Sequence, residues 1–275
     1  LEQAILAYGR AIDRNPLDFR AHYELNQLLY RIGDDANFLR SYDLGAAAYS
    51  EAGGFPLDKA NFLLQIGDLE AARAHFERAI ELLPQHVMPR DGLGLTLTRM
   101  GEYPEAIRAH EAVLKMEPEN ADGWRNYAET LLRSGDASKA RDAAERSLSI
   151  QPLHQGSLAL LGTAYQLLGD PRGDSLIDCE RFVRSFELSP PEGYSDIESF
   201  NRDLQIVLSE SHHGKREAVT QPLRGGTQSL ENLFDRKHRL VDAFKVMVYN
   251  VVSAYIDSLE ISEDHVFLKR RRDGF

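Results

Sequence analysis

The chain has 275 residues, of which 43% are hydrophobic and 27% charged, and its formal net charge at pH 7 is −11. This composition is typical of a globular protein with a sizeable core, and the acidic balance disfavours a nucleic-acid partner, which needs a basic surface. The sequence contains no run of about 18 apolar residues, so it predicts no membrane span. The single cysteine, Cys179, cannot form an internal disulfide. We therefore expect a cytoplasmic protein that binds neither nucleic acid nor membrane.

Glycine, proline and alanine recur in one frame through the first two-thirds of the chain. Glycines stand 34 residues apart, at Gly33, Gly67, Gly101, Gly135 and Gly169. Prolines of the same frame are Pro16, Pro84, Pro118 and Pro152, and its small residues are Ala4, Ala72, Ala106 and Ala140. Glycine permits the left-handed residue that ends a helix, alanine permits close helix packing, and proline stops the helix that follows. The frame therefore predicts a structural unit of 34 residues that repeats along the chain, with helices that end at fixed positions.

The fourth repeat shows the motif most fully, through Trp124, Tyr127, Ala128, Leu131, Gly135, Ala140 and Pro152. With this motif and this period, the region resembles a tetratricopeptide-repeat array. The resemblance implies an all-α fold, a tetratricopeptide-repeat superhelix built from antiparallel helix pairs. We place the array, together with a capping helix, at residues 1–188. The chain enters the frame at the second helix of a repeat.

The second repeat departs from the frame in two places. Phe38 stands where a small residue is expected, and the segment GGFP, residues 53–56, interrupts the exit from the repeat. We therefore expect a distorted or longer connection near residues 50–57. We also expect the helix pair over residues 36–66 to be the weakest of the array.

The resemblance implies a concave groove lined mainly by the first helix of each repeat. Carried onto this sequence, it gives the groove candidates Tyr23, Gln27, Asn61, Asp91, Arg125 and Glu129. The last groove position of each first helix reads Arg31, Gln65, Arg99, Arg133 and Leu167. Three arginines in register could bind a carboxylate-bearing peptide through bidentate hydrogen bonds. The structural alternative is that each arginine, two residues before the helix-ending glycine, compensates the negative end of the helix dipole.

Nine histidines raise the question of a metal site. An iron site of two histidines and one carboxylate uses a His-x-Asp/Glu pair, and this spacing occurs at His22–Glu24 and His75–Glu77. Both pairs lie in repeat helices, where residues two apart point away from each other, so we expect surface or packing roles. Adjacent His212 and His213 make a poor chelate, and Cys179 lies in a predicted helical run without a histidine in register, which favours a buried thiol. The sequence predicts no catalytic set and no metal site.

A different module follows residue 188. Apolar residues at helical spacing over 175–188 predict one capping helix, which the segment SPPEGYSD, residues 189–196, ends. Ser195 with Glu198 forms a capping-box signature, and an apolar stripe predicts a helix from Ile197 to Leu208. A second apolar stripe predicts a helix over 240–255, and the glycine-containing segment QPLRGGTQSLENLF separates the two.

The order of segments in this module resembles a bacterial group of tetratricopeptide proteins that carry a C-terminal 2-oxoglutarate/iron(II)-dependent oxygenase domain. The segments are EGYSDIESFN, QPLRGGTQSLENLF, VSAYIDSL and DHVFLKRR, and the most specific residues are Arg224, Gly225, Gly226, Thr227 and Gln228. The chain departs from the family at Gln221-Pro222, where Gln-Ser is usual. In the family, the barrel strands and the iron motif follow the last segment. The resemblance therefore places the iron(II) and 2-oxoglutarate ligands beyond Phe275 and none in this chain.

Residues 189–275 are accordingly expected to form the helical lead-in to such a barrel, and Arg224 to Gln228 a loop that supports it. The alternative is a plain glycine turn between two helices. Two functions remain open. The first is a module that binds a protein or peptide and presents it to an attached oxygenase, which would make the parent protein a hydroxylase. The second is an interaction scaffold whose oxygenase domain is degenerate or absent. In either case we expect this chain alone to be inactive as an enzyme.

Overall fold

The computed structural model of the protein describes residues 2–210, 232–262 and 265–268. These residues form helices and connecting segments, and none of them lies in a β-strand. Residue contacts divide the chain into two compact units, the first ending at Ile177 and the second beginning at Asp178. This division falls before residue 188, where we expected the array to end.

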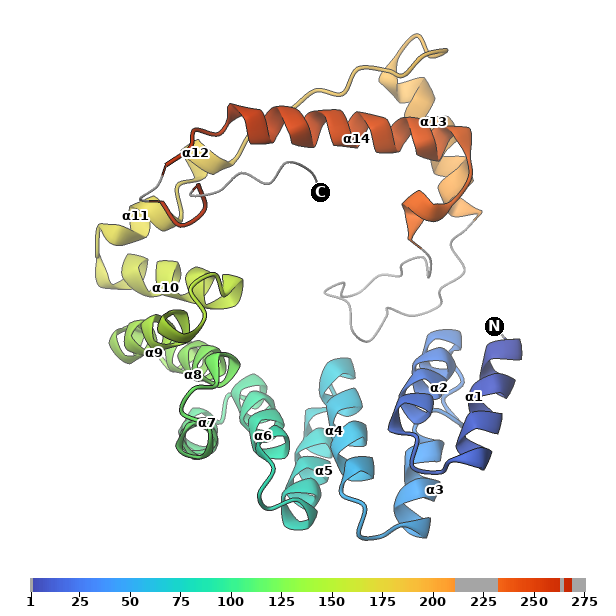
Figure 1. Ribbon diagram of the computed structural model, residues 1–275, viewed down its shortest axis with the longest axis vertical. Helices are drawn as coiled ribbons and strands as arrows, with labels where there is room; N and C mark the ends of the chain where they lie inside the picture. The colour runs from blue at the N-terminus through green and yellow to red at the C-terminus, as the bar shows by residue number, and fades with distance from the viewer. Residues whose placement is uncertain (1, 211–231, 263–264, 269–275) are drawn as a thin grey trace. The chain divides into compact units, whose positions relative to one another are not determined.

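The first unit is a run of antiparallel helix pairs, as the all-α prediction requires. Its first helices are α2 (Phe19–Ile32), α4 (Gly54–Ile66), α6 (Val87–Met100), α8 (Ala121–Arg133) and α10 (Gln155–Leu168). Its second helices are α1 (Glu2–Arg14), α3 (Arg40–Ala48), α5 (Leu69–Leu82), α7 (Tyr103–Met116) and α9 (Ala137–Ile150), and a short α11 (Arg172–Leu176) follows. Consecutive helices pack side by side, and each first helix also packs on the next first helix. Figure 1 shows these helices along an arc, with α4, α6 and α8 toward its inner side.

The recurring glycines end the first helices in the left-handed conformation, as predicted. Those at 33, 67, 101 and 169 cap their helices with φ between 66° and 88°, and Gly135 follows α8 with φ of 91°. A Cβ added at any of the five would meet no described atom within 4 Å. The backbone dihedral, rather than crowding, therefore requires glycine at these positions.

The alanines and prolines of the frame also take their predicted places. Ala72, Ala106 and Ala140 lie on second helices at 0% exposure, where the absence of a larger side chain lets the paired helices approach closely. Three of the prolines fall in the turns that follow second helices, at Pro84 after α5, Pro118 after α7 and Pro152 after α9. Each proline lacks the N–H that a further helical turn would need.

The second repeat is irregular, and its largest departure from the frame lies ahead of α3. The connection from α2 to α3 runs from Gly33 to Leu39, whereas only Gly67 and Asp68 join α4 to α5. Leu39 has φ of 67°, the one positive φ outside glycine among the described residues. Its N–H donates to the Oδ1 of buried Asn26 at 2.6 Å, which fixes the start of α3.

The connection from α3 to α4, residues 49–53, is one residue longer than the four-residue connections that precede α6, α8 and α10, in line with the longer connection expected near residues 50–57. The GGFP segment does not interrupt the exit, because it caps and begins α4, with Phe55 and Pro56 buried. Proline is tolerated in the first turn of a helix, where its missing N–H has no intrahelical partner to lose. Gly54 leaves room for the ring of Phe19, whose Cζ would lie 2.5 Å from an added Cβ.

The single capping helix predicted over residues 175–188 is not formed. α11 ends at Leu176, a separate α12 covers Cys179–Phe182, and residues 183–188 are not helical. The break arises because Asp178 starts a new helix, with its side chain accepting from the N–H of Arg181 at 2.9 Å. Helical spacing of apolar residues thus persisted across a helix boundary.

α11 and the residue that follows it nevertheless cover the last first helix. Ile177 packs against α10 at Gly162, where an added Cβ would lie 2.8 Å from the isoleucine Cδ1. The guanidinium of Arg172 lies over the ring of Tyr165, 4.3 Å from its centroid. This short segment therefore covers part of α10, as a terminal capping element of a repeat array is expected to do.

The described part of the second unit holds α12, α13 (Ile197–Ser209), η1 (Leu233–Asp235) and α14 (Arg239–Ser258). Both helices predicted from apolar stripes are confirmed, and they pack through Phe200, Leu204, Leu240 and Val241. The predicted capping box of Ser195 and Glu198 was wrong. Asp196 caps α13 instead, and its side chain accepts from the N–H of Ser199 at 2.7 Å.

Candidate functional site

Asp91 of α6 is fixed by a side chain from the next first helix. Asn126 of α8, which is 2% exposed, donates from Nδ2 to both carboxylate oxygens of Asp91 at 2.9 Å. The Asp91 side chain keeps 27% of its surface exposed. Burial raises the pKa of its carboxyl, and the hydrogen bond from Asn126 opposes that rise. The two residues form a bond between repeats whose exposed component is a carboxylate.

His110 of α7 lies behind this pair. Its side chain is 0% exposed, and its Nδ1 lies 3.7 Å from Asp91 Oδ1, beyond normal hydrogen-bond distance. The ring packs on Gly94 of α6, where an added Cβ would come within 2.6 Å of Cε1. Burial, followed by the charge of Arg125, lowers the pKa of His110 to about 4, so the imidazole is neutral at pH 7. Both ring nitrogens of His110 and the Oδ1 of Asn126 are buried without a hydrogen-bond partner.

The predicted groove arginines are engaged with the array itself. Arg125 Nη1 lies 3.3 Å from Glu129 Oε2, and Arg133 Nε lies 3.1 Å from Glu129 Oε1, so one carboxylate holds two guanidinium groups. Arg99 donates from Nη1 to the carbonyl oxygen of Leu64 in the last turn of α4, at 2.8 Å. Arg99 therefore favours the structural alternative, although it serves the end of the neighbouring helix rather than its own.

The remaining groove candidates lie on α2 and α4. Gln27 is only 8% exposed, and its Nε2 donates to the hydroxyl of Tyr23 at 2.7 Å. Gln27 therefore orients Tyr23 and has little surface of its own for a ligand to contact. Burial lowers the pKa of Arg31. Asn61 is half-buried on α4. The described structure thus places every predicted groove residue on a first helix, and it groups Asp91 with those of α8.

Buried polar residues that the sequence reasoning missed hold the array together. Besides Asn126 and His110 they include Asn26, whose Nδ2 donates to the carbonyl of His22 and to Ser41 Oγ, each at 2.8 Å. Asp58 of α4 is half-buried, and burial raises the pKa of its carboxyl to about 6. The signal that could have found them is a polar side chain on the packed stripe of a helix, because such a group needs a partner.

The described residues hold no group of three or more His, Cys, Asp or Glu side chains placed to bind a metal ion. His22 is buried on α2 with Nε2 3.0 Å from the carbonyl of Pro16, and His75 is half-buried on α5. Cys179 is exposed, so the prediction of a buried thiol was wrong, because the helix expected to cover it breaks at Asp178. The histidines at 212–213 and the loop at 224–228 lie outside the described residues.

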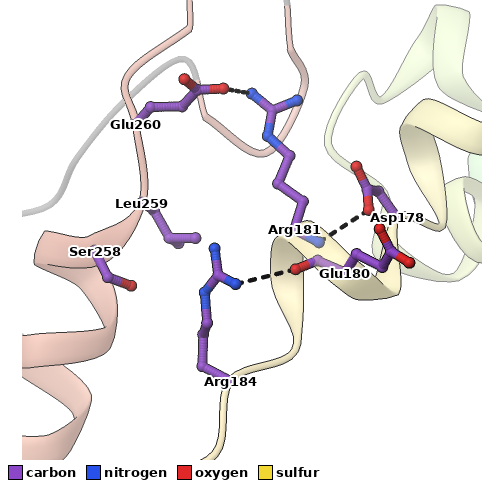
Figure 2. A pocket seen from close by; sticks show the side chains of 7 residues that line it. All are labelled: Asp178, Glu180, Arg181, Arg184, Ser258, Leu259 and Glu260. Carbon is purple, nitrogen blue, oxygen red and sulfur yellow. Dashed lines mark hydrogen bonds and ion pairs between the residues drawn. The ribbon is translucent and has the colours of Figure 1, made fainter.

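The second unit carries a pocket of about 490 Å³ at the carboxyl end of α14. Its lining residues are Asp178, Glu180, Arg181, Arg184, Ser258, Leu259 and Glu260. Figure 2 shows the two arginines extending from the α12 segment, Arg181 toward Glu260 and Arg184 back toward the carbonyl of Glu180. The pair of Arg181 and Glu260 joins α12 to the segment after α14, and we assign the pocket a structural role.

None of the helices that the structure describes has both the length and the apolar composition that crossing a membrane requires.

An arc of antiparallel helix pairs with side chains of successive first helices on its inner side defines a helical-repeat protein. Sequence profiles of the tetratricopeptide repeat match residues 1–53 and 92–154, and residues 57–86, together just over half of the chain. The chain belongs to the tetratricopeptide-repeat family.

Relatives of known description share only short stretches with it. The Hsp70-Hsp90 organizing protein of Triticum aestivum is 28% identical over 113 residues, which cover 41% of this chain and 19% of that protein. The cellulose synthase operon protein C of Komagataeibacter sucrofermentans is 32% identical over 95 residues, covering 32% of this chain and 7% of that protein. The chain therefore spans less than a fifth of the length of either relative.

Solved structures share the fold. A tetratricopeptide repeat protein from Parabacteroides merdae matches with a TM-score of 0.53 at 15% identity, covering 67% of this chain and 73% of that one. Yeast Tom70 matches with a TM-score of 0.53 at 21% identity, covering 62% and 37%. MamA from Desulfovibrio magneticus RS-1 matches with a TM-score of 0.51 at 19% identity, covering 61% and 97%. At these identities the likeness shows the fold alone.

Proposed function

We propose that this chain is a protein- or peptide-binding module whose ligand lies along the first helices on the inner side of the arc. The observation that carries the proposal is the run of charged side chains that adjacent first helices present together, Asp91 on α6 and Arg125, Glu129 and Arg133 on α8. The wheat relative, named for organizing Hsp70 and Hsp90, supports a role in binding other proteins.

The arginines give the proposal its first chemical component. Arg133 has 53% of its side chain exposed, and it shares Glu129 with Arg125. Two guanidinium groups on one carboxylate leave a net positive charge, to which an acidic side chain or a C-terminal carboxylate is the complement. Arg99 occupies the same repeat position as Arg133. Replacing Arg99, however, would also remove its hydrogen bond to the carbonyl of Leu64, which joins two repeats.

The test is a peptide array of nonapeptides, each with one fixed residue and the other positions randomised, probed with the labelled 275-residue chain. We expect a subset of peptides to bind, with acidic fixed residues among them. The double variant Arg125→Gln, Arg133→Gln should lose the acidic subset while its thermal midpoint stays nearly unchanged, because exposed pairs contribute only about 0.2–1 kcal/mol each. The matched control is Arg78→Gln, Arg108→Gln, which removes two arginines from second helices, each paired with a glutamate three residues away. An array on which no peptide binds contradicts the proposed function.

A second candidate function comes from the resemblance of residues 189–275 to the lead-in of a 2-oxoglutarate/iron(II)-dependent oxygenase. On that proposal, the array presents its ligand to an oxygenase barrel, and the alternative is a scaffold without one. If the natural polypeptide continues beyond Phe275, its conversion of 2-oxoglutarate to succinate, stimulated by the ligand of the array, is the measurement that separates the two. Succinate formation supports the oxygenase, and its absence with iron(II) supplied supports the scaffold.

A further inference from the structure

The side chain of Asp91 differs from the other charged groups on α6 and α8 in how firmly it is held. Asn126 donates one nitrogen to both of its oxygens at 2.9 Å, and Asn126 is itself 2% exposed, so it has little freedom to move. His110, at 0% exposure, closes the space on the α7 side. Figure 1 shows α6 and α8 toward the inner side of the arc, with α7 outside them. The exposed 27% of the Asp91 side chain therefore lies where the adjacent first helices α6 and α8 meet, beside its bond to Asn126.

The carboxylate of Asp91 also lacks a cationic partner in the described part of the chain. The one ionisable side chain with a nitrogen within 4 Å is that of His110, and His110 is neutral at pH 7. Arg125 is near enough to lower the pKa of Asp91, but its Nη1 is bonded to Glu129. Asp122 and Glu117 act in the opposite direction and raise that pKa, as burial does. A fixed, partly buried carboxylate beside two further carboxylates favours a positively charged group.

From this geometry we propose that Asp91 is a specificity-determining residue of the inner face, which selects a lysine or arginine side chain of the bound peptide. The inference rests on the proposed function and gives it a second chemical component. The carboxylate is held in place by Asn126 before the ligand arrives, so little ordering is needed when the basic group binds. The net charge of −11 on the whole chain adds long-range attraction for a basic segment.

Asn126 and His110 act as positioning residues in this arrangement. Asn126 orients the carboxylate, and His110 fills the space behind it without offering a competing charge. A carboxamide at position 91 would still accept from Asn126 Nδ2 through its own oxygen. Asp91→Asn therefore removes the charge while keeping the bond that joins the repeats.

The experiment uses fluorescence polarisation on the 275-residue chain with labelled nonapeptides taken from the array described above. Each peptide is made in three versions, with lysine, norleucine or glutamate at the fixed position. For the wild-type chain we expect the lysine version to bind at least about tenfold more tightly than the norleucine version, which corresponds to one charge-assisted hydrogen bond. Asp91→Asn should reduce that ratio to near one and leave the affinity for the norleucine version unchanged. Asn126→Ala should reduce the ratio as well, a readout that loss of stability alone would not move.

The matched control is Glu70→Gln, which removes one negative charge from an exposed position on α5. It should change the lysine-to-norleucine ratio less than twofold. If Asp91→Asn fails to fold, Asp91→Ser, which keeps a small polar group, replaces it. The inference is overturned if peptides bind without a preference for lysine, or if the Asp91→Asn variant keeps that preference. Either result leaves the proposed function standing. An array on which nothing binds overturns both.

Discussion

His110 and Asp58 are two ionisable residues that the fold drives toward their neutral forms, with opposite consequences for stability. The pKa of His110 is lowered to about 4, so below its usual value of 6.5 the unfolded chain binds a proton that the folded chain does not. Stability is therefore lost as the pH falls from about 6.5 to about 4. The pKa of Asp58 is raised to about 6 from 3.8, so the folded chain binds the extra proton and stability is gained as the pH falls from about 6 to about 4. The two effects oppose each other in the same pH window.

Asp58→Asn should make the protein more stable at pH 7, because it removes the cost of a buried carboxylate. Each pKa unit corresponds to about 1.4 kcal/mol, and partial exposure reduces the effect, so we expect a gain of about 1–2 kcal/mol. The gain should shrink at pH 4.5, where the carboxyl of the wild type is protonated. Urea unfolding at the two pH values, with Glu70→Gln as the control, measures it. An equal gain at both pH values would contradict the raised pKa.

His110→Gln should have the opposite pH signature. Glutamine cannot bind a proton in this range, so the variant should lack the loss of stability that His110 causes between pH 6.5 and 4.5. Its stability at pH 4.5 relative to pH 7 should therefore exceed that of the wild type, by about 1–3 kcal/mol. Urea unfolding at the two pH values checks this. If the stability of the variant and of the wild type changes equally with pH, the lowered pKa of His110 is contradicted.

At the scale of helices, α3 and α4 of the irregular repeat approach each other closely at one glycine, Gly45. A Cβ added at Gly45 would lie 2.2 Å from the ring of Phe55, which is fully buried and also packs near Phe19, His22 and Tyr49. The aromatic ring therefore occupies the space that a side chain on α3 would take. The close approach at Gly45 packs α4 on a second helix of only nine residues.

Gly45→Ala should destabilise the array by about 1–3 kcal/mol, because the ring of Phe55 has little space into which to move. The matched control is Gly9→Ala, also in a second helix, where an added Cβ meets no described atom within 4 Å. That change should leave stability unchanged or raise it by up to about 1 kcal/mol, since alanine favours a helix more than glycine does. Thermal unfolding of the two variants decides between crowding and helix propensity. A Gly45→Ala variant as stable as the wild type would show that the ring can yield.

Most helices of the array could be predicted from the sequence because their boundaries are set by local chemistry. A glycine with positive φ ends each first helix, and the 34-residue frame repeats that signal five times. The features that could not be predicted depend on contacts between distant residues. The N–H of Leu39 donates to Asn26, and this bond fixes the start of α3; Phe38 marked the repeat as irregular, but no local pattern predicted where α3 would begin. The same holds for the site, where Asp91 was found by register but Asn126 and His110 were not.

The end of α10 shows what terminates the repeat array in the whole molecule. Cutting the chain after Ile177 keeps the contacts of Ile177 with Gly162 and of Arg172 with Tyr165, whereas cutting after Gly169 removes both. We expect the longer fragment to unfold several degrees higher, because the exposed face of the last repeat costs stability in a one-dimensional array. Circular dichroism during heating measures the difference. Equal midpoints would mean that α11 contributes nothing to the array.

We also expect the 275-residue chain to form no succinate when it is supplied with iron(II) and 2-oxoglutarate. The two His-x-Glu spacings lie on α2 and α5, where residues two apart diverge around the helix. The assay compares succinate with a protein-free control, because iron(II) and oxygen decompose 2-oxoglutarate slowly without an enzyme. Turnover that depends on the protein would place catalytic ligands within residues 1–275.

The glycines that end the first helices have a consequence for chemical synthesis of this protein. Their backbones occupy a region of φ that L-residues avoid and D-residues prefer. A D-alanine at residue 67 or 101 would therefore adopt the native conformation without strain while restricting the unfolded chain. Each such replacement should stabilise the array by about 0.4–1 kcal/mol, whereas L-alanine at the same position should destabilise it. The difference in stability between the two mirror-image amino acids would thus measure how strongly the backbone φ at these positions selects for handedness.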